Sequence, residues 1–517
     1  MPAALSGTMP LWPPDAFAVA AAILKRSGAY REVANVWPPK GYADTDDWHN
    51  KVHAISEEWR TACENKRDWP TTVGVWWNTI ILRECTKTAD ILLDRDLFDA
   101  LVGIVASADQ ASRSFGFTSC KKASAKLAER ATGNLSRNTL CELIDSSRVR
   151  VMPKAHNPVS GMTLRSLTHN LALWDRTEVE PSWNNVILPG FAEDGIHLLL
   201  LPWPLTIKPN AFHKAPSNYG LRLPKRVDLF EYDISFQASD VERAIELIKE
   251  AERTVGKVHG VILPEVSMSI DHFKDMQQKA QAVFDIPLLI AGIGGPNASK
   301  LGTNGVAIST DADEDPITQS KHHRWRLDHE QAKSYGISHC LPEKPENGAW
   351  WEGIHIEDRT CVFFNANDWM AFCVLICEDL ARQDPLSEMV RSVGPNLVIA
   401  LLLDGPQISD RWPAHYATVL ADDPRSSVLT LTSAGMVDLA RSQFGGGPRS
   451  IGLWKDAITR KNQKINLEPG SEAIVLRLRG ETRKEWTVDG RNDGGRTDYL
   501  RLIGIYQISP PSAGASP

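Results

Sequence analysis

From about residue 190 to 508, the chain consists of short apolar runs that alternate with amphipathic stretches. Near-continuous apolar runs are typical of strands covered on both faces, and they leave little choice of fold class. Between several runs lie helical patterns, the clearest of which includes the capping-box sequence Ser239-Asp-Val-Glu242. This alternation predicts an α/β domain built from layers of helices and sheets. The runs are 197–201, 258–263, 287–293, 306–308, 372–376, 397–403 and 427–431.

Residues 1–185 have a different pattern, in which mixed apolar and charged residues recur at helical spacing. We therefore expect a mainly helical N-terminal domain over 1–185, an α/β domain over 190–508, and a disordered tail over 509–517. In the N-terminal domain, helices are predicted over 15–33, 47–65, 94–106, 120–131 and 163–174, with a short strand over 149–152.

One apolar run ends on a cysteine. In Val374-Leu-Ile-Cys377-Glu-Asp-Leu380, a strand stops at Cys377 and an acidic helix start follows at once. The N-terminus of a helix carries partial positive charge, which favours the thiolate. Because the thiolate attacks carbonyl or nitrile carbon, Cys377 is a candidate nucleophile.

Two further strand ends supply groups that could assist such a nucleophile. A buried run stops at Pro264, and Glu265 follows as a candidate general base. The basic, aromatic segment 319–328 contains Lys321, which could stabilise an oxyanion. Each residue alone is also typical of a solvated loop. Together they favour a shared site, because catalytic groups collect at strand ends in α/β folds.

These segments resemble the Glu–Lys–Cys motifs of the carbon–nitrogen hydrolase, or nitrilase, superfamily. Leu263-Pro-Glu265 is similar to the glutamate motif, Lys321-His-His323 to the lysine motif, and Leu375-Ile-Cys377-Glu-Asp379 to the nucleophile motif. The resemblance covers about residues 190–508, and the Cys-Glu-Asp form is similar to glutaminase-type members that supply ammonia to a synthetase. The flanking segments 304–309, 394–397, 427–435 and 447–450 are similar as well.

The resemblance implies a four-layer αββα sandwich and hydrolysis of small amides through a thioester. Nitriles are less favoured, because Glu378 follows the cysteine where true nitrilases more often have tryptophan. Glu265 would be the base and Cys377 the nucleophile, while Lys321 and the backbone N–H of Glu378 would hold the oxyanion. No cofactor or metal is implied, and members form homodimers or larger homo-oligomers.

Many members carry a second glutamate that orients the lysine. Glu330 is the best-placed candidate for this role, and Glu343 and Glu346 compete with it. The separation between Lys321 and Cys377 is longer than usual for the family, so Lys333 competes with Lys321.

The extra length between lysine and cysteine is attributed to an inserted loop over 341–356. The substrate pocket is expected to include side chains that follow motifs or strands. These are His323, Trp325, Trp351, Asp404 and Trp412.

An alternative is that the domain is an assembly scaffold or sensor without catalysis. Similar domains occur fused to bacterial reverse transcriptases with defence roles, and the N-terminal domain would then bind a protein or nucleic acid. Its basic cluster Lys121, Lys122, Lys126 and Arg130 could make such a contact, although clusters like this are usually solvated helix faces. The segment Gly292-Ile-Gly294-Gly295-Pro-Asn297 departs from the dinucleotide-binding pattern at Asn297 and is interpreted as a turn.

Charge and composition exclude several classes. The net charge of −7 argues against a chain that mainly coats nucleic acid. No apolar run reaches the roughly 18 residues of a membrane span, and we expect a cytoplasmic protein. The eight cysteines contain no CxxC pair, so free, mostly buried thiols are expected rather than a zinc site.

Overall fold

Two seven-stranded sheets form the centre of the α/β part in the computed structural model. The first has the order β10-β9-β8-β7-β4-β19-β20, and the second has the order β18-β17-β16-β15-β14-β13-β3. Strands β4, β7 and β8 run parallel, as do β14, β15 and β16. The structure describes residues 10–35, 37–65, 67–116, 124–156, 161–188, 194–297, 300–341, 348–366, 369–443, 446–492 and 496–511.

The strands of the first sheet are β4 Ile196–Leu200, β7 Gly260–Met268, β8 Leu289–Asn297, β9 Lys300–Ser309, β10 Ile317–Ser320, β19 Ala473–Lys484 and β20 Arg496–Ile508. Those of the second are β3 Glu180–Val186, β13 Thr360–Ala366, β14 Met370–Ile376, β15 Leu397–Leu402, β16 Ser427–Thr432, β17 Ser450–Lys455 and β18 Asn462–Asn466.

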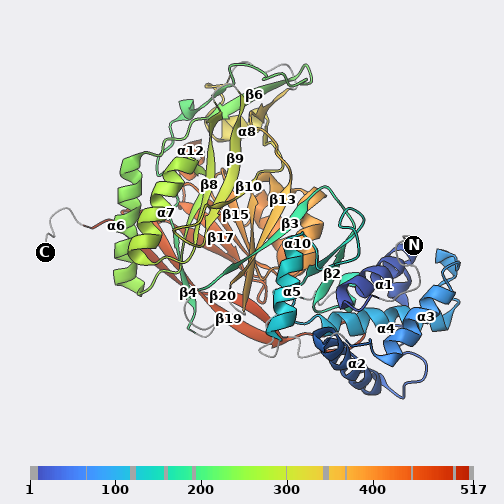
Figure 1. The fold of residues 1–517 in the computed structure, drawn as a ribbon. Helices are drawn as coiled ribbons and strands as arrows, with labels where there is room; N and C mark the ends of the chain where they lie inside the picture. Colours follow the sequence, from blue (N-terminus) through green and yellow to red (C-terminus); the bar gives the residue numbers. More distant parts are fainter. Residues whose placement is uncertain are drawn as a thin grey trace.

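Side chains alternate along each strand, so one face of the first sheet packs against the second sheet and the other face packs against helices. On β4, Leu198 and Leu200 join the core shared with the second sheet, whereas Leu199 joins the core under helices α6 and α7. Successive side chains of a strand point to opposite faces, so both faces of the first sheet are covered. Helices α10 and α11 contribute to the core that contains the second sheet, and Figure 1 shows helices on both sides of the strands. These helices are α6 Ala238–Val255, α7 Ile270–Phe284, α10 Glu388–Val393 and α11 Trp412–Asp422.

The start of α6 differs in detail from the predicted one. The capping box is formed by Gln237 and Asp240, so it begins two residues before the predicted box at Ser239. The apolar face of this helix is buried as its spacing predicts, through Val241, Ala244 and Ile248.

A third, four-stranded sheet lies at one end of the sandwich, around β6 and α8 in Figure 1. Its order is β11-β12-β6-β5. Part of the predicted inserted loop over 341–356 is therefore wrong, because Ala349–Glu352 pairs in parallel with Val227–Tyr232. The elements are β5 Phe212–Lys214, β6 Val227–Tyr232, β11 Arg326–Leu327, β12 Ala349–Glu352 and helix α8 His329–Ser334.

The N-terminal helices pack around a core of their own, beside the sandwich in Figure 1. The predicted helix over 163–174 is wrong: a short 3₁₀ turn, Leu164–Leu167, is followed by strand β2, which pairs with β1. The helix α3 was not predicted. The elements are α1 Pro13–Ser27, α2 Thr45–Asn65, α3 Thr71–Leu82, α4 Arg95–Ala111, α5 Ala125–Leu135, β1 Arg150–Pro153 and β2 Leu171–Trp174.

The two parts of the chain interlock. Strand β3 pairs with β13, so the second sheet begins before residue 185, the predicted end of the N-terminal domain. Near the other end of the chain, Arg491 is fully buried between the N-terminal elements. Its guanidinium donates to the backbone carbonyls of Ala106 (3.0 Å) and Leu167 (2.7 Å) and pairs with Asp489 at 2.7 Å.

Within the described ranges, no helix combines the length and apolar character that crossing a bilayer requires. The tail predicted over 509–517 lies outside the described residues from 512 onward.

Candidate active site

Cys377 occupies a strained turn between a strand and a short helix. Strand β14 ends at Ile376 and helix α9, Glu378–Ala381, begins at the next residue. Cys377 has φ 45° and ψ −107°, which L-residues rarely adopt. Its N–H donates to the carbonyl of Leu401 at 2.9 Å, and the residue is 3% exposed. The turn is therefore held by the sheet, and it presents a buried thiol.

Glu265 lies on an irregular part of β7. The pairing register between β7 and β8 shifts between Leu263 and Met268, and Val266 has φ 42°. Gly292 of β8 permits this bulge, because a Cβ at that position would lie 2.3 Å from the carbonyl oxygen of Pro264 and 2.4 Å from Cα of Glu265. The predicted turn at Gly292 is thus wrong: β8 continues, and the missing side chain makes room for Glu265.

Lys321 follows β10 and is 1% exposed. Its Nζ donates to Glu265 Oε1 at 2.8 Å and to Glu352 Oε2 at 2.6 Å. Asn304 Nδ2 donates to the same two carboxylates, at 2.8 Å and 2.6 Å. The lysine and the amide together thus hold the two buried carboxylates in fixed positions.

The expected partner of the lysine, Glu330, does not occupy that place. Glu330 is exposed on the first turn of α8, and Lys333 is exposed on the same helix. Glu352 contacts Lys321 instead, because β12 brings it beside the first sheet. Glu343 and Glu346, the other candidates, lie outside the described residues.

One carboxylate oxygen of Glu265 takes no part in these hydrogen bonds. Among the described residues, Glu265 Oε2 is buried and has no hydrogen-bond partner, while Oε1 accepts from Lys321 and Asn304. A buried acceptor without a partner is costly in a structural network, and it is available to take a proton.

The charges around Cys377 oppose the predicted thiolate. Burial raises the pKa of the Cys377 thiol well above its usual range, and the nearby Glu265 carboxylate raises it further, while Lys321 lowers it. Burial and the carboxylates thus act against the thiolate that the helix start is expected to favour. Helix α9 has only four residues, Glu378–Ala381.

Glu265 and Lys321 are also shifted in pKa. Burial raises the pKa of Glu265, and the charge of Lys321 partly offsets this. Burial alone would lower the pKa of Lys321, but the carboxylates of Glu265 and Glu352 outweigh it and hold that pKa well above its ordinary range. The two carboxylates thus favour the ammonium form of this lysine.

Asp379 connects the nucleophile turn to the lysine segment. Its fully buried carboxylate accepts from the backbone N–H of His322, at 3.2 Å and 3.1 Å, and lies 2.9 Å from Nδ1 of His323. His323, expected in the pocket, is thus partly buried and bound to Asp379. This contact fixes the position of Lys321 relative to Cys377.

Asp404 follows β15 and is 2% exposed. Its carboxylate accepts hydrogen bonds from the Tyr335 hydroxyl and from the Arg411 guanidinium. The charge of Asp404 is also among the causes of the raised pKa of Cys377. Asp404 therefore belongs to the surroundings of the cysteine, with Tyr335 and Arg411 as partners that the sequence did not suggest.

The three tryptophans predicted to line the substrate pocket pack against aromatic and aliphatic side chains. Trp325 is buried and packs edge-on against Phe230 and Tyr335, with ring centroids 5.6 Å and 5.7 Å away. Trp412 is half-buried at the start of α11 and packs against Tyr416 of the same helix. Trp351 is half-buried on β12 and packs against a small cluster with Leu229 and Leu301.

The four-stranded sheet covers the site. Val266 and Leu403, which adjoin Glu265 and Asp404, share a hydrophobic cluster with Phe230, Trp325 and Trp350. A cavity of about 50 Å³ remains beside Glu352, Val266 and Leu403. Such a space has room for a few water molecules beside Glu352.

Sequence reasoning missed Glu352, Tyr335 and Arg411. The first lies in a segment interpreted as a loop, and no local pattern distinguishes it from neighbouring glutamates. Asn304 and Asp379 lie in segments 304–309 and 375–379, which resemble family motifs. Their polar side chains among apolar residues could have indicated that they take part in the site.

Two members of the N-terminal basic cluster, Arg130 and Lys126, have partners within the chain. Arg130 forms a two-pronged pair with Glu142, at 2.6 Å for both bonds, and lies over the ring of Trp12. Lys126 donates to the carbonyl of Glu64. Lys121 and Lys122 lie outside the described residues.

Comparison with known proteins gave no match to any family model and no match among curated proteins. Solved structures with partial likeness include an amidase from Nesterenkonia sp., at 11% identity and TM-score 0.33, covering 55% of this chain and 90% of that one. A nitrilase-superfamily protein from Saccharomyces cerevisiae has 12% identity and TM-score 0.32, covering 56% and 92%. The glutamine-dependent NAD+ synthetase from Acinetobacter baumannii has 11% identity and TM-score 0.35, covering 60% and 48%. At these values the likenesses carry no conclusion about this chain.

Proposed function

We propose that the chain hydrolyses the carbon–nitrogen bond of small amides, with Cys377 as nucleophile. The observation that carries this proposal is the buried contact of Lys321 with Glu265, two groups whose charges both act on the Cys377 thiol, while Glu265 Oε2 has no hydrogen-bond partner among the described residues. A structural ion pair needs neither an adjacent thiol nor an unsatisfied oxygen. Perturbed groups that converge in this way are typical of catalytic sites. The motif resemblance to carbon–nitrogen hydrolases agrees with this function.

The proposed reaction begins with the neutral thiol that the high pKa of Cys377 implies. Glu265 Oε2 takes the Sγ proton as sulfur attacks the amide carbon and a C–S bond forms. The Lys321 ammonium and the backbone N–H of Glu378 stabilise the resulting oxyanion. Glu265 then gives its proton to the nitrogen, the C–N bond breaks, and the amine leaves.

The second half releases the acid. Glu265 takes a proton from water as the water oxygen attacks the thioester carbon. The new oxyanion collapses, the C–S bond breaks, and the sulfur regains the proton from Glu265. Glu352 would hold Lys321 in place through both halves, as its 2.6 Å contact suggests.

Intact mass spectrometry with a panel of small amides tests this function directly. We expect a mass increase equal to the acyl group, located on Cys377 by peptide mapping. The acyl group that accumulates would also identify half of the substrate. If no amide leaves an adduct or is turned over, although iodoacetamide labels Cys377, the hydrolase proposal fails.

A second candidate function, a sensor or scaffold without turnover, is favoured by one observation. Cys377, Glu265 and Lys321 are each at most 3% exposed. The mass experiment separates the two functions, because a sensor or scaffold without turnover forms no acyl adduct on Cys377.

The variant Glu265→Gln should separate the two roles of this carboxylate. Its negative charge raises the pKa of Cys377, so its removal should lower that pKa and increase the thiolate fraction at a given pH. Alkylation of Cys377 by iodoacetamide should therefore become faster at pH 8, while amide turnover is lost because the base is missing. The pH profile of alkylation, mapped to Cys377, should shift to lower pH. An unchanged or upward shift would show that Glu265 does not act on the thiol.

A further inference from the structure

Two buried oxygens of the candidate active site have no hydrogen-bond donor among the described residues. One is Oε2 of Glu265, and the other is Oδ1 of Asn304. Both residues are at most 2% exposed. They belong to one network, because Asn304 Nδ2 donates to the other oxygen of Glu265 at 2.8 Å. Buried acceptors nearly always have a donor, so two neighbouring acceptors without one indicate a ligand that donates to both.

The orientation of the Asn304 amide follows from its neighbours. Besides its bond to Glu265 Oε1, Nδ2 donates to Glu352 Oε1 at 2.6 Å. The reverse orientation would place the amide oxygen against two carboxylates, which can only accept. Oδ1 is therefore the end of this amide that is left without a donor.

Asn304 faces the layer that carries the proposed nucleophile. Val306 and Ile308 of β9 belong to the core cluster that also contains Cys377. Side chains two residues apart on a strand share a face, so Asn304 points to the same side of the first sheet as these two residues. The backbone carbonyl of Asn304 accepts from the N–H of Lys321 at 2.9 Å, which fixes the strand beside the lysine.

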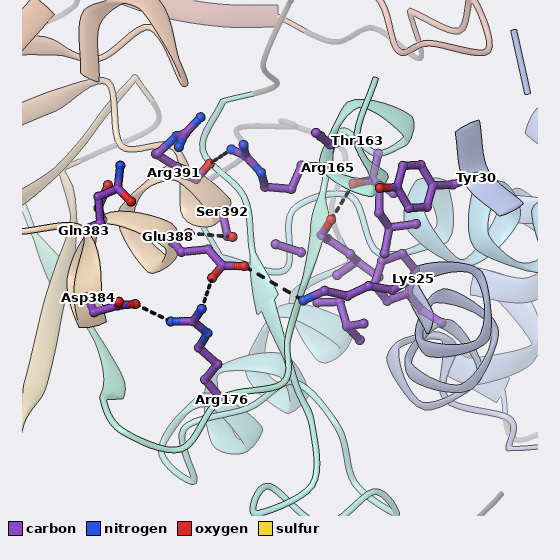
Figure 2. A pocket seen from close by; sticks show the side chains of 17 residues that line it. Lys25, Tyr30, Thr163, Arg165, Arg176, Gln383, Asp384, Glu388, Arg391 and Ser392 are labelled. Carbon is purple, nitrogen blue, oxygen red and sulfur yellow. Dashed lines mark hydrogen bonds and ion pairs between the residues drawn. The ribbon is translucent and has the colours of Figure 1, made fainter. Parts of the chain in front are cut away.

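A larger cavity, of about 440 Å³, between the N-terminal region and α10 has a different character (Figure 2). Each cation in its wall pairs with a carboxylate. In Figure 2, Lys25 and Arg176 point toward Glu388, at 4.0 Å and 3.2 Å. The other two cations, Arg165 and Arg391, share Asp423. The charges of this cavity are thus satisfied within the chain, unlike the two acceptors of the candidate active site.

We propose that the substrates are primary amides, whose unsubstituted –NH2 group donates one N–H to Glu265 Oε2 and the other to Asn304 Oδ1. This inference rests on the proposed function, in which Glu265 protonates the leaving nitrogen and must lie within hydrogen-bond reach of it. Glu265 passes the Sγ proton to this nitrogen, the C–N bond breaks, ammonia leaves, and the acyl group stays on sulfur. A substituent on nitrogen would replace one N–H and place carbon against a buried oxygen.

Matched amides of one acyl group test this proposal on the full chain. The acyl group that labels Cys377 in the amide panel is presented as its primary amide and as its N-methyl amide. We expect the primary amide to acylate Cys377 at least about tenfold faster, the effect of one buried hydrogen bond. Equal rates would overturn the role of the –NH2 group and leave the hydrolase function in place. If no amide of the panel acylates Cys377, the hydrolase function fails, and this inference fails with it.

Asn304→Ser tests whether Oδ1 is the source of the selectivity. Serine is too short to reach the second N–H, but its hydroxyl can still donate to a neighbouring carboxylate. Acylation should slow for both compounds, because Asn304 also holds Glu265 and Glu352. The rate ratio of primary to N-methyl amide should fall toward one, which a general loss of structure would not produce.

Ser309→Ala is the matched control for this variant. Ser309 is a buried polar residue on the same strand, and its replacement should leave the rate ratio unchanged. Thermal unfolding of both variants shows whether each one folds, and the comparison on the parent chain decides the proposal if Asn304→Ser does not. A ratio that stays high in folded Asn304→Ser, or that falls equally in Ser309→Ala, would overturn the role of Asn304.

Discussion

Cys377→Ala is expected to lower amide turnover by at least about a thousandfold, because loss of the nucleophile leaves only binding and oxyanion contributions. The fold should persist. Cys377 contacts the sheet through its backbone N–H, which alanine retains. The measurement is ammonia release from the best amide of the panel, together with the thermal midpoint of each variant.

Cys373→Ala is the matched control for this change. Cys373 lies on the same strand, four residues earlier, and is fully buried in the core between the sheets. Its replacement should reduce stability by about 1 kcal/mol, as small core truncations do, and leave turnover unchanged. Turnover that survives in Cys377→Ala, or that falls equally in Cys373→Ala, would remove Cys377 from the mechanism.

Arg491→Leu should have the largest effect on stability, about 3–5 kcal/mol, because it leaves buried carboxylates without their cation. Arg491 pairs with Asp489 at 2.7 Å and lies 3.8 Å from Asp109, and all three side chains are at most 1% exposed. Its guanidinium also donates to carbonyls of α4 and of the turn before β2. Loss of these contacts should loosen the N-terminal helices from the sandwich.

Hydrogen exchange along α4, compared with thermal unfolding of the whole chain, measures this loosening. Exchange in α4 should accelerate strongly in Arg491→Leu, while β14 and β15 remain protected. Arg479→Leu, an exposed position on β19, should stay within about 0.5 kcal/mol of the parent. If Arg491→Leu behaves like that control, the N-terminal region is held by other contacts.

The strands around the proposed site were visible in the sequence because their apolar runs are almost uninterrupted. Ile376 and Leu401, for example, pair in β14 and β15 as parallel neighbours. Local pattern failed where the chain is less regular. Residues 163–174 have a mixture of apolar and polar residues that fits a helix, yet β2 forms there because it pairs with β1. Pairing of that kind depends on a partner strand and not on the segment itself.

The charge state of Cys377 also depends on residues that are distant in the sequence. A cysteine before a helix predicts a thiolate when only its neighbours in sequence are considered. The pKa of Cys377 is raised because burial and the carboxylate of Glu265 act on it from other elements. Neither contribution can be read from the residues next to the cysteine.

The sequence by itself determined the alternation of strands and helices, and it identified Glu265, Lys321 and Cys377 as candidates at strand ends. These features follow from local periodicity and from residue chemistry. Only the tertiary structure decided that Glu352, and not Glu330, contacts Lys321, and that Gly292 makes room for the Glu265 bulge. The physical reason is that strand pairing brings together residues far apart in the chain, and burial then sets their charges.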